Sequence, residues 1–108
     1  MNIRLSNREI RFRISYEEFA RLKNGETLNE ETAFPYETSL SYSIKRSKNY
    51  DCRFHENSLI LHVPESYIQL LEKKLPSKDG LEEEISVSQG TSLKLSLEVD
   101  VKTKRKKL

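Results

Sequence analysis

The chain opens with IRLSNREIRFRISYEEFARL, residues 3–22, which predicts a strand, a tight turn, a second strand and a helix. Apolar residues alternate with polar ones on both sides of the turn, a pattern typical of a hairpin with one apolar face. Ser15 followed by Glu18 is a capping-box signature, so the helix is expected to begin there. Asn24 and Gly25 supply a common helix stop. This unit decides the fold because it recurs.

The recurrence is visible as two offsets. With an offset of 49 residues, the opening hairpin is matched by residues 52–54 and 59–63, which again lead into a helix. Beyond the helix the offset becomes 53, and residues 28–44 align with residues 81–97 without a gap. Seven of those 17 positions are identical. Each copy therefore predicts the order strand, strand, helix, strand, strand.

The predicted fold is an α+β domain of two tandem β-β-α-β-β repeats, at residues 1–46 and 50–101, packed about a pseudo-twofold axis. Neither copy is large enough to bury its own sheet, so we expect the two to share one core. Eight strands and two helices could form a small barrel or two facing antiparallel sheets, and the sequence does not choose between them. A single domain over residues 1–101 is expected.

Two predicted strands show the clearest alternation of apolar and polar residues. In one of them, Leu40 and Tyr42 alternate with serines. The other runs from Leu93 to Val101, with leucine or valine at every second position. We expect Leu40 and Leu95 to face the shared core.

The formal net charge of +2 does not describe the folded body. Five of the 19 basic residues lie in the last seven positions, which leaves 14 basic residues against 17 acidic ones. The body is thus slightly acidic, and a nucleic-acid interpretation based on global charge is weakened. Residues 102–108 contain a single apolar residue, Leu108, and are predicted to form a basic disordered tail. This tail either binds nucleic acid or an acidic membrane surface, or only adds solubility.

Cysteine content and hydropathy indicate the compartment. Cys52 is the only cysteine, so an internal disulfide is excluded. No apolar stretch approaches the length of a membrane span or of a signal-peptide core. We therefore expect a cytoplasmic protein without a membrane span.

A family resemblance begins in the opening strands, at Ile3-Arg4 and at residues 10–15, IRFRIS. Further matching positions lie in later strands and before the second predicted helix: Thr32, Phe34, Leu40, Tyr42, Ile44, Val63, Pro64, Glu98 and Asp100. Over residues 1–101 the chain resembles a family of small, uncharacterised bacterial proteins, a domain of unknown function. The resemblance implies no assigned activity. The basic residues 102–107 depart from the acidic tail usual in that family.

Arginines are the most informative polar group. The candidate binding residues lie on one face of the first hairpin and at the equivalent places in the second: Arg4, Arg11, Arg13, Arg53 and His62. Guanidinium groups in a row can hold phosphates or carboxylates through paired hydrogen bonds. The structural alternative is cross-strand ion pairing with Glu9, Glu17 or Glu98. The sequence leaves both interpretations open and favours the structural one.

No residue set supports catalysis or metal binding. Cys52, His55 and His62 are close in sequence, but their strand and turn positions point them in different directions. The glutamates at 30–31 and 82–84 are expected to be solvated strand edges that discourage aggregation. We therefore expect no catalytic residues, no metal and no cofactor.

The expected function is a small, non-catalytic cytoplasmic binding or protein-interaction module with an unknown protein partner. One alternative is a nucleic-acid-binding protein that uses the arginine face and the basic tail. A second alternative is a small-molecule carrier or enzyme with a site between the repeats, since such interfaces often form clefts. An exposed apolar patch would favour the protein partner.

Overall fold

The structure is a computed structural model that describes residues 1–77 and 79–100. The order strand, strand, helix, strand, strand occurs twice along the chain. The first half contains β1 (Asn2–Ser6), β2 (Glu9–Ile14), α1 (Tyr16–Lys23), β3 (Leu28–Phe34) and β4 (Thr38–Arg46). The second half contains β5 (Asp51–His55), β6 (Ser58–Val63), α2 (Glu65–Lys74), β7 (Leu81–Ser88) and β8 (Thr91–Val99). The predicted tail lies outside the described residues.

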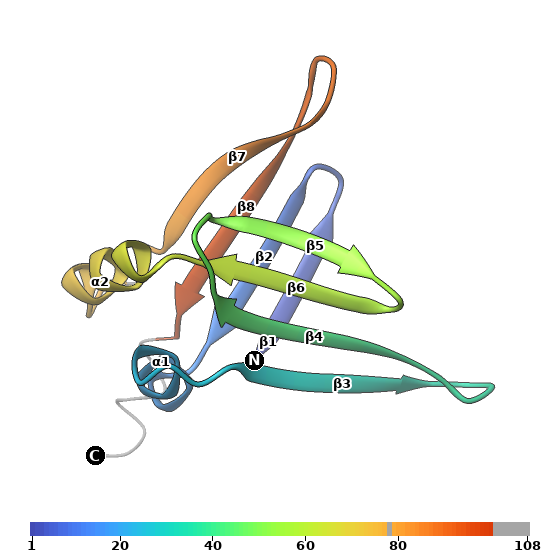
Figure 1. The fold of residues 1–108 in the computed structure, drawn as a ribbon, viewed down its shortest axis with the longest axis horizontal. Coiled ribbons are helices and arrows are strands. Elements are labelled where there is room, and N and C mark those ends of the chain that lie inside the picture. Colours follow the sequence, from blue (N-terminus) through green and yellow to red (C-terminus); the bar gives the residue numbers. More distant parts are fainter. Residues whose placement is uncertain (78, 101–108) are drawn as a thin grey trace.

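The strands form two four-stranded sheets that combine hairpins from both halves of the chain (Figure 1). The strand order is β1-β2-β8-β7 in sheet A and β3-β4-β6-β5 in sheet B. Each helix therefore connects one sheet to the other, because β2 precedes α1 and β3 follows it, while β6 precedes α2 and β7 follows it. The mixed α+β class predicted from the sequence is confirmed.

The described strands do not close into a barrel, so that alternative is wrong. The expectation of antiparallel sheets is also wrong at the centre of each sheet, where β2 pairs with β8 and β4 pairs with β6 in parallel. The outer pairs are hairpins and are antiparallel because a short turn reverses the chain. The central strands come from different hairpins, so no turn fixes their direction.

Corresponding strands pair in corresponding registers. Ile3 lies opposite Phe12 in the first hairpin, and Cys52 lies opposite Leu61 in the third, at an offset of 49 in both strands. The other pairs agree in the same way under the offsets of 49 and 53, except at the end of β7, where a register shift after Ser86 places Ser88 opposite Thr91. The agreement therefore concerns which residues pair within each sheet.

The hydrophobic core lies between the sheets, near the end where the two helices sit (Figure 1). Its side chains are almost completely buried and come from both sheets and both helices: Phe12, Ile14, Phe19, Leu22, Leu28, Ile44, Leu61, Val63, Ile68, Leu71, Leu95, Leu97 and Val99. Leu95 is confirmed as a core residue, whereas Leu40 is only half-buried. The hairpin turns diverge from this core, so the far ends of the strands lose its cover.

Both helices are short. They span eight and ten residues, and neither helix of the described chain is long and apolar enough to cross a membrane. Lys23 at the end of α1 forms an ion pair with Glu72 of α2, which links the two helices at the closed end of the molecule.

The predicted capping box of α1 is present. The Ser15 hydroxyl accepts a hydrogen bond from the Glu18 amide at 3.1 Å, and the Glu18 carboxylate accepts one from the Ser15 amide at 2.9 Å. Burial raises the pKa of Glu18, but these hydrogen bonds and the amino group of Met1 outweigh it and hold the pKa below its ordinary value. The carboxylate is therefore stabilised in its charged form.

Ser15→Ala is expected to lower the free energy of unfolding by about 1 kcal/mol, because the Glu18 amide loses the hydroxyl that accepts its hydrogen bond. Chemical denaturation measures this, and Ser66→Ala on the exposed first turn of α2 is the control. Since the pKa of Glu18 is lowered by folding, its stabilisation is complete above its unfolded pKa and is lost as the pH falls through the folded one. Equal losses of unfolding free energy for Ser15→Ala and Ser66→Ala would contradict a stabilising role for the Ser15 cap.

Candidate functional site

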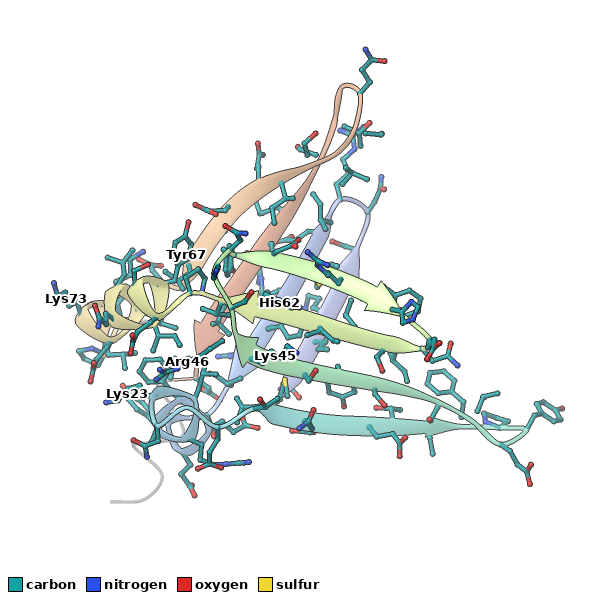
Figure 2. All side chains as sticks on the ribbon, viewed as in Figure 1. Lys23, Lys45, Arg46, His62, Tyr67 and Lys73 are labelled. Atoms are coloured by element: carbon teal, nitrogen blue, oxygen red, sulfur yellow. The ribbon has the colours of Figure 1, made fainter. Side chains whose placement is uncertain are left out.

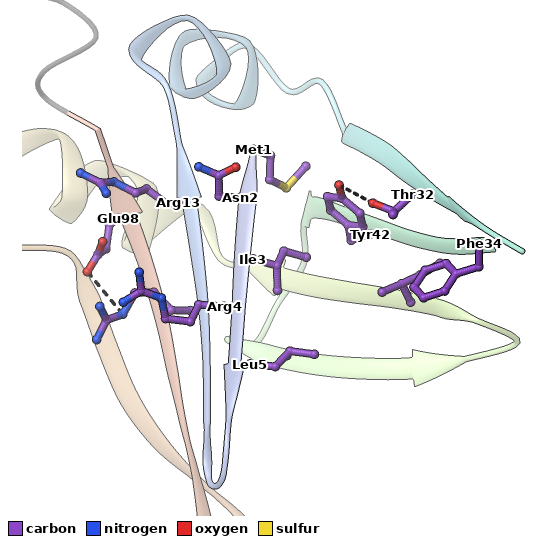
Figure 3. A pocket seen from close by; sticks show the side chains of 12 residues that line it. Met1, Asn2, Ile3, Arg4, Leu5, Arg13, Thr32, Phe34, Tyr42 and Glu98 are labelled. Carbon is purple, nitrogen blue, oxygen red and sulfur yellow. Dashed lines mark hydrogen bonds and ion pairs between the residues drawn. The ribbon is translucent and has the colours of Figure 1, made fainter.

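A groove of about 490 Å³ runs along β1, at the edge of sheet A (Figure 3). It is lined on one side by residues of β3–β4 in sheet B, and it extends to Arg4, Arg11, Arg13 and Glu98 on the outward face of sheet A. Met1, Ile3 and Leu5 form one wall. The other wall consists of four side chains on the facing surface of sheet B: Thr32, Phe34, Leu40 and Tyr42. Figure 3 shows Ile3 and Leu5 pointing from β1 toward the side of Thr32, Phe34 and Tyr42. Both walls come from the first half of the chain, and Glu98 of β8 is the described lining residue that the second half contributes.

Large apolar side chains of this groove are open to solvent. Leu5 is 60% exposed and Phe34 is 51% exposed. Ile3 lies opposite the buried Phe12 in the β1–β2 hairpin, so the two side chains share a face of the sheet. Leu5 is two residues from Ile3 on the same strand and therefore lies on that face as well. Because the sheets diverge beyond the helices, the apolar faces continue past the core without a cover. Exposed apolar surfaces of this kind are typical of interaction sites.

The closed end of the groove is polar and fixed. The amino group of Met1 lies 2.8 Å from Glu30 and 3.0 Å from Glu18. Burial lowers the pKa of this amine, but its hydrogen bonds to the two carboxylates outweigh the effect and raise the pKa above its ordinary value. Tyr42 and Thr32 share a hydrogen bond of 3.1 Å between their hydroxyl oxygens. The contact between the Met1 amino group and Glu30 thus joins the two walls at one end of the groove.

Three of the predicted binding residues, Arg4, Arg11 and Arg13, lie on the face of sheet A that is turned away from the core, and all three are also lining residues of the groove. Arg11 lies 3.1 Å from Glu9 and 3.6 Å from Glu98, and Arg13 lies 3.5 Å from Asp100. The hydrogen bond to Glu9, followed by the charge of Glu98, raises the pKa of Arg11. The predicted structural partners Glu9 and Glu98 are therefore both found. Ion pairing occupies much of this arginine row.

Arg4 differs from the other two arginines. It is exposed and has no ion-pair partner within residues 1–77 and 79–100. It lies directly opposite Arg11 in the β1–β2 hairpin, so two like charges are neighbours across the strands. Like charges in this position are destabilising unless an anion balances them. Arg4 therefore lies at the rim of the groove with a guanidinium group that no described carboxylate pairs with.

The remaining predicted residues, Arg53 and His62, lie on the outward face of the other sheet, so the structure does not join the five into one site. Arg53 forms an ion pair with Asp51 at 3.2 Å. Burial, followed by the nearby charges of Lys45 and Arg53, lowers the pKa of His62. Figure 2 shows His62 and Lys45 on adjacent strands β6 and β4. This face is a second, separate group of basic side chains.

Cys52 is half-buried beside the core. Burial, with a further contribution from Asp51, raises the pKa of its thiol to about 11. The thiol therefore stays protonated at neutral pH, which disfavours nucleophilic chemistry. Within the described residues, no three histidine, cysteine or acidic side chains are grouped as a metal site.

Comparison with known proteins places the chain in a family. The family model DUF7009, described as a family of unknown function, matches residues 1–107. The chain belongs to the DUF7009 family. The resemblance to a family of unknown function is confirmed at this level. No curated protein matches the sequence.

In this member of the DUF7009 family, sequence reasoning found the arginines but missed the groove. Ile3, Leu5, Phe34 and Leu40 follow the strand alternation and so resemble core residues. For Leu5, Phe34 and Leu40, a detectable signal was their position near the hairpin turns, far from the predicted helices that complete the core. Four groove positions, Thr32, Phe34, Leu40 and Tyr42, were also among those carrying the family resemblance.

Proposed function

We propose that this protein is a non-catalytic protein-interaction module that holds an extended segment of a partner protein in the groove between β1 and β3–β4. The observation that carries this proposal is the exposure of Leu5 and Phe34 on opposite walls of one groove. An exposed apolar groove between rigid strands gains binding free energy when it is covered.

The form of the groove favours a polypeptide over the other ligand classes. One wall, β1, is an edge strand, which can pair with an added backbone as well as contact its side chains. A nucleic acid would need free basic groups, yet Arg11 and Arg13 are in ion pairs. A small-molecule site between the two halves is less favoured, because Glu98 is the only described lining residue of the groove that comes from the second half.

The organisation of the chain supports two further parts of this proposal. We infer that it is a tandem β-β-α-β-β repeat about a pseudo-twofold axis, because the pairing registers agree under the sequence offsets. In that case Phe54 and Val87, 65% and 62% exposed, occupy the places of Leu5 and Phe34. The lone thiol of Cys52 fits a reducing cytoplasm.

The proposal is tested with peptides of about ten residues, long enough to span a strand, selected from a random library on the immobilised full chain. Fluorescence polarisation then measures the affinity of the selected peptides. Leu5→Asn is expected to weaken them by about tenfold or more, because an anchor in an apolar groove is lost. The variant should remain folded, since Leu5 is mostly exposed.

The matched control is Leu70→Asn. Leu70 is a 49% exposed leucine on α2, outside the groove, and its replacement should leave peptide affinity unchanged. Failure to enrich any peptide, or equal binding to both variants, would contradict the proposal. Salt-sensitive binding of single- or double-stranded DNA or RNA that Arg11→Ala weakens would instead favour the nucleic-acid function.

A further inference from the structure

The free edge of β1 limits what can occupy the groove. In sheet A, β1 pairs with β2 on one side only, and its other side faces the groove. An edge strand presents unpaired backbone N–H and C=O groups that act as a template for another strand. β1 contains no proline and no acidic residue, so nothing in its sequence blocks a negatively charged strand from pairing there.

The other described edge strands are less suited to an acidic segment. β3 carries Glu30 and Glu31, and β7 carries three consecutive glutamates at 82–84. β5 carries Arg53, but Asp51 already balances that charge at 3.2 Å. Among these edges, β1 alone combines an unmatched arginine, Arg4, with the exposed apolar groove.

A cross-strand row shows what a strand added to β1 would meet. Arg4, Arg11, Ser96 and Glu82 lie opposite one another on the outward face of sheet A. Glu9 and Glu98 compensate Arg11, but no carboxylate of the described residues forms an ion pair with Arg4, at the open end of the row. A side chain on an added strand opposite Arg4 would have its Cβ atom about 5 Å away, close enough for an ion pair.

We propose that the groove binds an extended segment in which an acidic residue is flanked on each side by an apolar residue, and that this segment adds to β1 as a fifth strand of sheet A. The inference rests on the proposed function and specifies its partner. The two apolar side chains lie beside Ile3 and Leu5 and enter the groove. The carboxylate lies beside Arg4, because successive residues of a strand point to opposite faces.

This pattern explains why both faces of β1 are needed. Backbone pairing supplies affinity without sequence preference, and the alternate side chains supply specificity. The positions of the added segment next to Ile3 and Leu5 disfavour charged residues, because a carboxylate there would lose its hydration without gaining a hydrogen-bond or ion-pair partner. The outward position next to Arg4 selects against lysine and arginine, because like charges would then be neighbours.

The probe is a synthetic eight-residue peptide that alternates leucine and glutamate. A second peptide replaces each glutamate by lysine, and a third has the same composition with its four leucines grouped together. Binding to the full chain is measured by isothermal titration calorimetry at low and moderate salt. The alternating acidic peptide is expected to bind about tenfold or more tightly than the other two.

A charge exchange at Arg4 separates recognition from folding. Arg4→Glu should weaken the acidic peptide by about tenfold and strengthen the lysine peptide by a similar factor. Lys73→Glu makes the same charge change on the exposed surface of α2, away from the groove (Figure 2), and should leave the preference between peptides unchanged. A variant that is only destabilised would bind both peptides more weakly, and its preference between the acidic and the lysine peptide would not be inverted.

Each outcome has one meaning. Inversion of the preference by Arg4→Glu supports the inferred segment. Equal binding of the acidic and lysine peptides, with both lost in Leu5→Asn, overturns the inference and leaves the proposed function standing. If none of the three designed peptides binds while the library peptides still do, the inferred acidic segment is wrong, but the groove remains the proposed peptide-binding site. If library peptides also fail, the proposed function falls with it.

Discussion

Leu95→Ala is expected to lower the free energy of unfolding by about 2 to 5 kcal/mol. Leu95 is completely buried on β8, and the hydroxyl of Tyr50 donates a hydrogen bond to its carbonyl oxygen at 3.1 Å. Removing the side chain leaves a cavity between sheet A and the rest of the core, which cannot collapse because β8 is a central strand. Urea denaturation followed by circular dichroism measures the loss.

Leu40→Ala provides the contrast. Leu40 is half-buried on the wall of the groove, so its replacement should cost less than half of the loss at Leu95. A loss at Leu40 as large as that at Leu95 would mean that the sheets close over the groove. The pair of variants therefore reports where the core ends.

Gly80→Ala is expected to destabilise the fold by about 3 kcal/mol or more. A Cβ atom at Gly80 would clash with the carbonyl oxygen of Leu97 and would lie 2.8 Å from its carbonyl carbon and 3.0 Å from the Cα atom of Glu98. These are backbone atoms of the central strand β8, which cannot rotate away. Thermal and urea unfolding of the variant measure the effect.

Gly25→Ala is the matched control for this prediction. Gly25 has a positive φ of 94°, but a Cβ atom there would have no neighbour within 4 Å. Its replacement adds local backbone strain of about 1 kcal/mol without a steric clash. A smaller loss at Gly80 than at Gly25 would contradict the close approach of the chain before β7 to β8.

The sequence predicted elements well because their signals are local. The hairpin of residues 3–14 and the capping box at Ser15 and Glu18 depend on neighbours a few residues apart. The alternation from Leu93 onward likewise identifies a strand with one buried face, as Leu95 and Leu97 confirm. Such patterns need no knowledge of the partner strand.

The partners of the strands could not be predicted in the same way. A period of two tells which face of a strand is apolar, but not which strand lies beside it. The parallel pairing of β2 with β8 joins residues more than 80 positions apart, such as Glu9 and Lys94. The divergence of the sheets, beyond which Leu5 and Phe34 are exposed, is likewise a feature of the three-dimensional arrangement and not of any single strand pattern.

The candidate site was predictable only in part. Glu9 and Glu98 were expected as structural partners of the arginines, and both contact Arg11. Asp100 was not expected to lie near Arg13, although the parallel register brings the end of β8 beside the end of β2. Arg4 differs from Arg11 and Arg13 in having no ion pair among the described residues. Which acidic side chain lies beside which arginine depends on the strand pairing, and the sequence pattern does not predict that pairing.

Amide hydrogen exchange of β1 in the presence of the alternating leucine–glutamate peptide tests the central claim most directly. In an antiparallel hairpin, alternate residues direct their amides away from the partner strand, so part of β1 exchanges freely in the unbound protein. We predict that these amides become protected at saturating peptide, while the edges β3, β5 and β7 keep their exchange rates. Protection of another edge, or saturation without any protection of β1, would contradict the account.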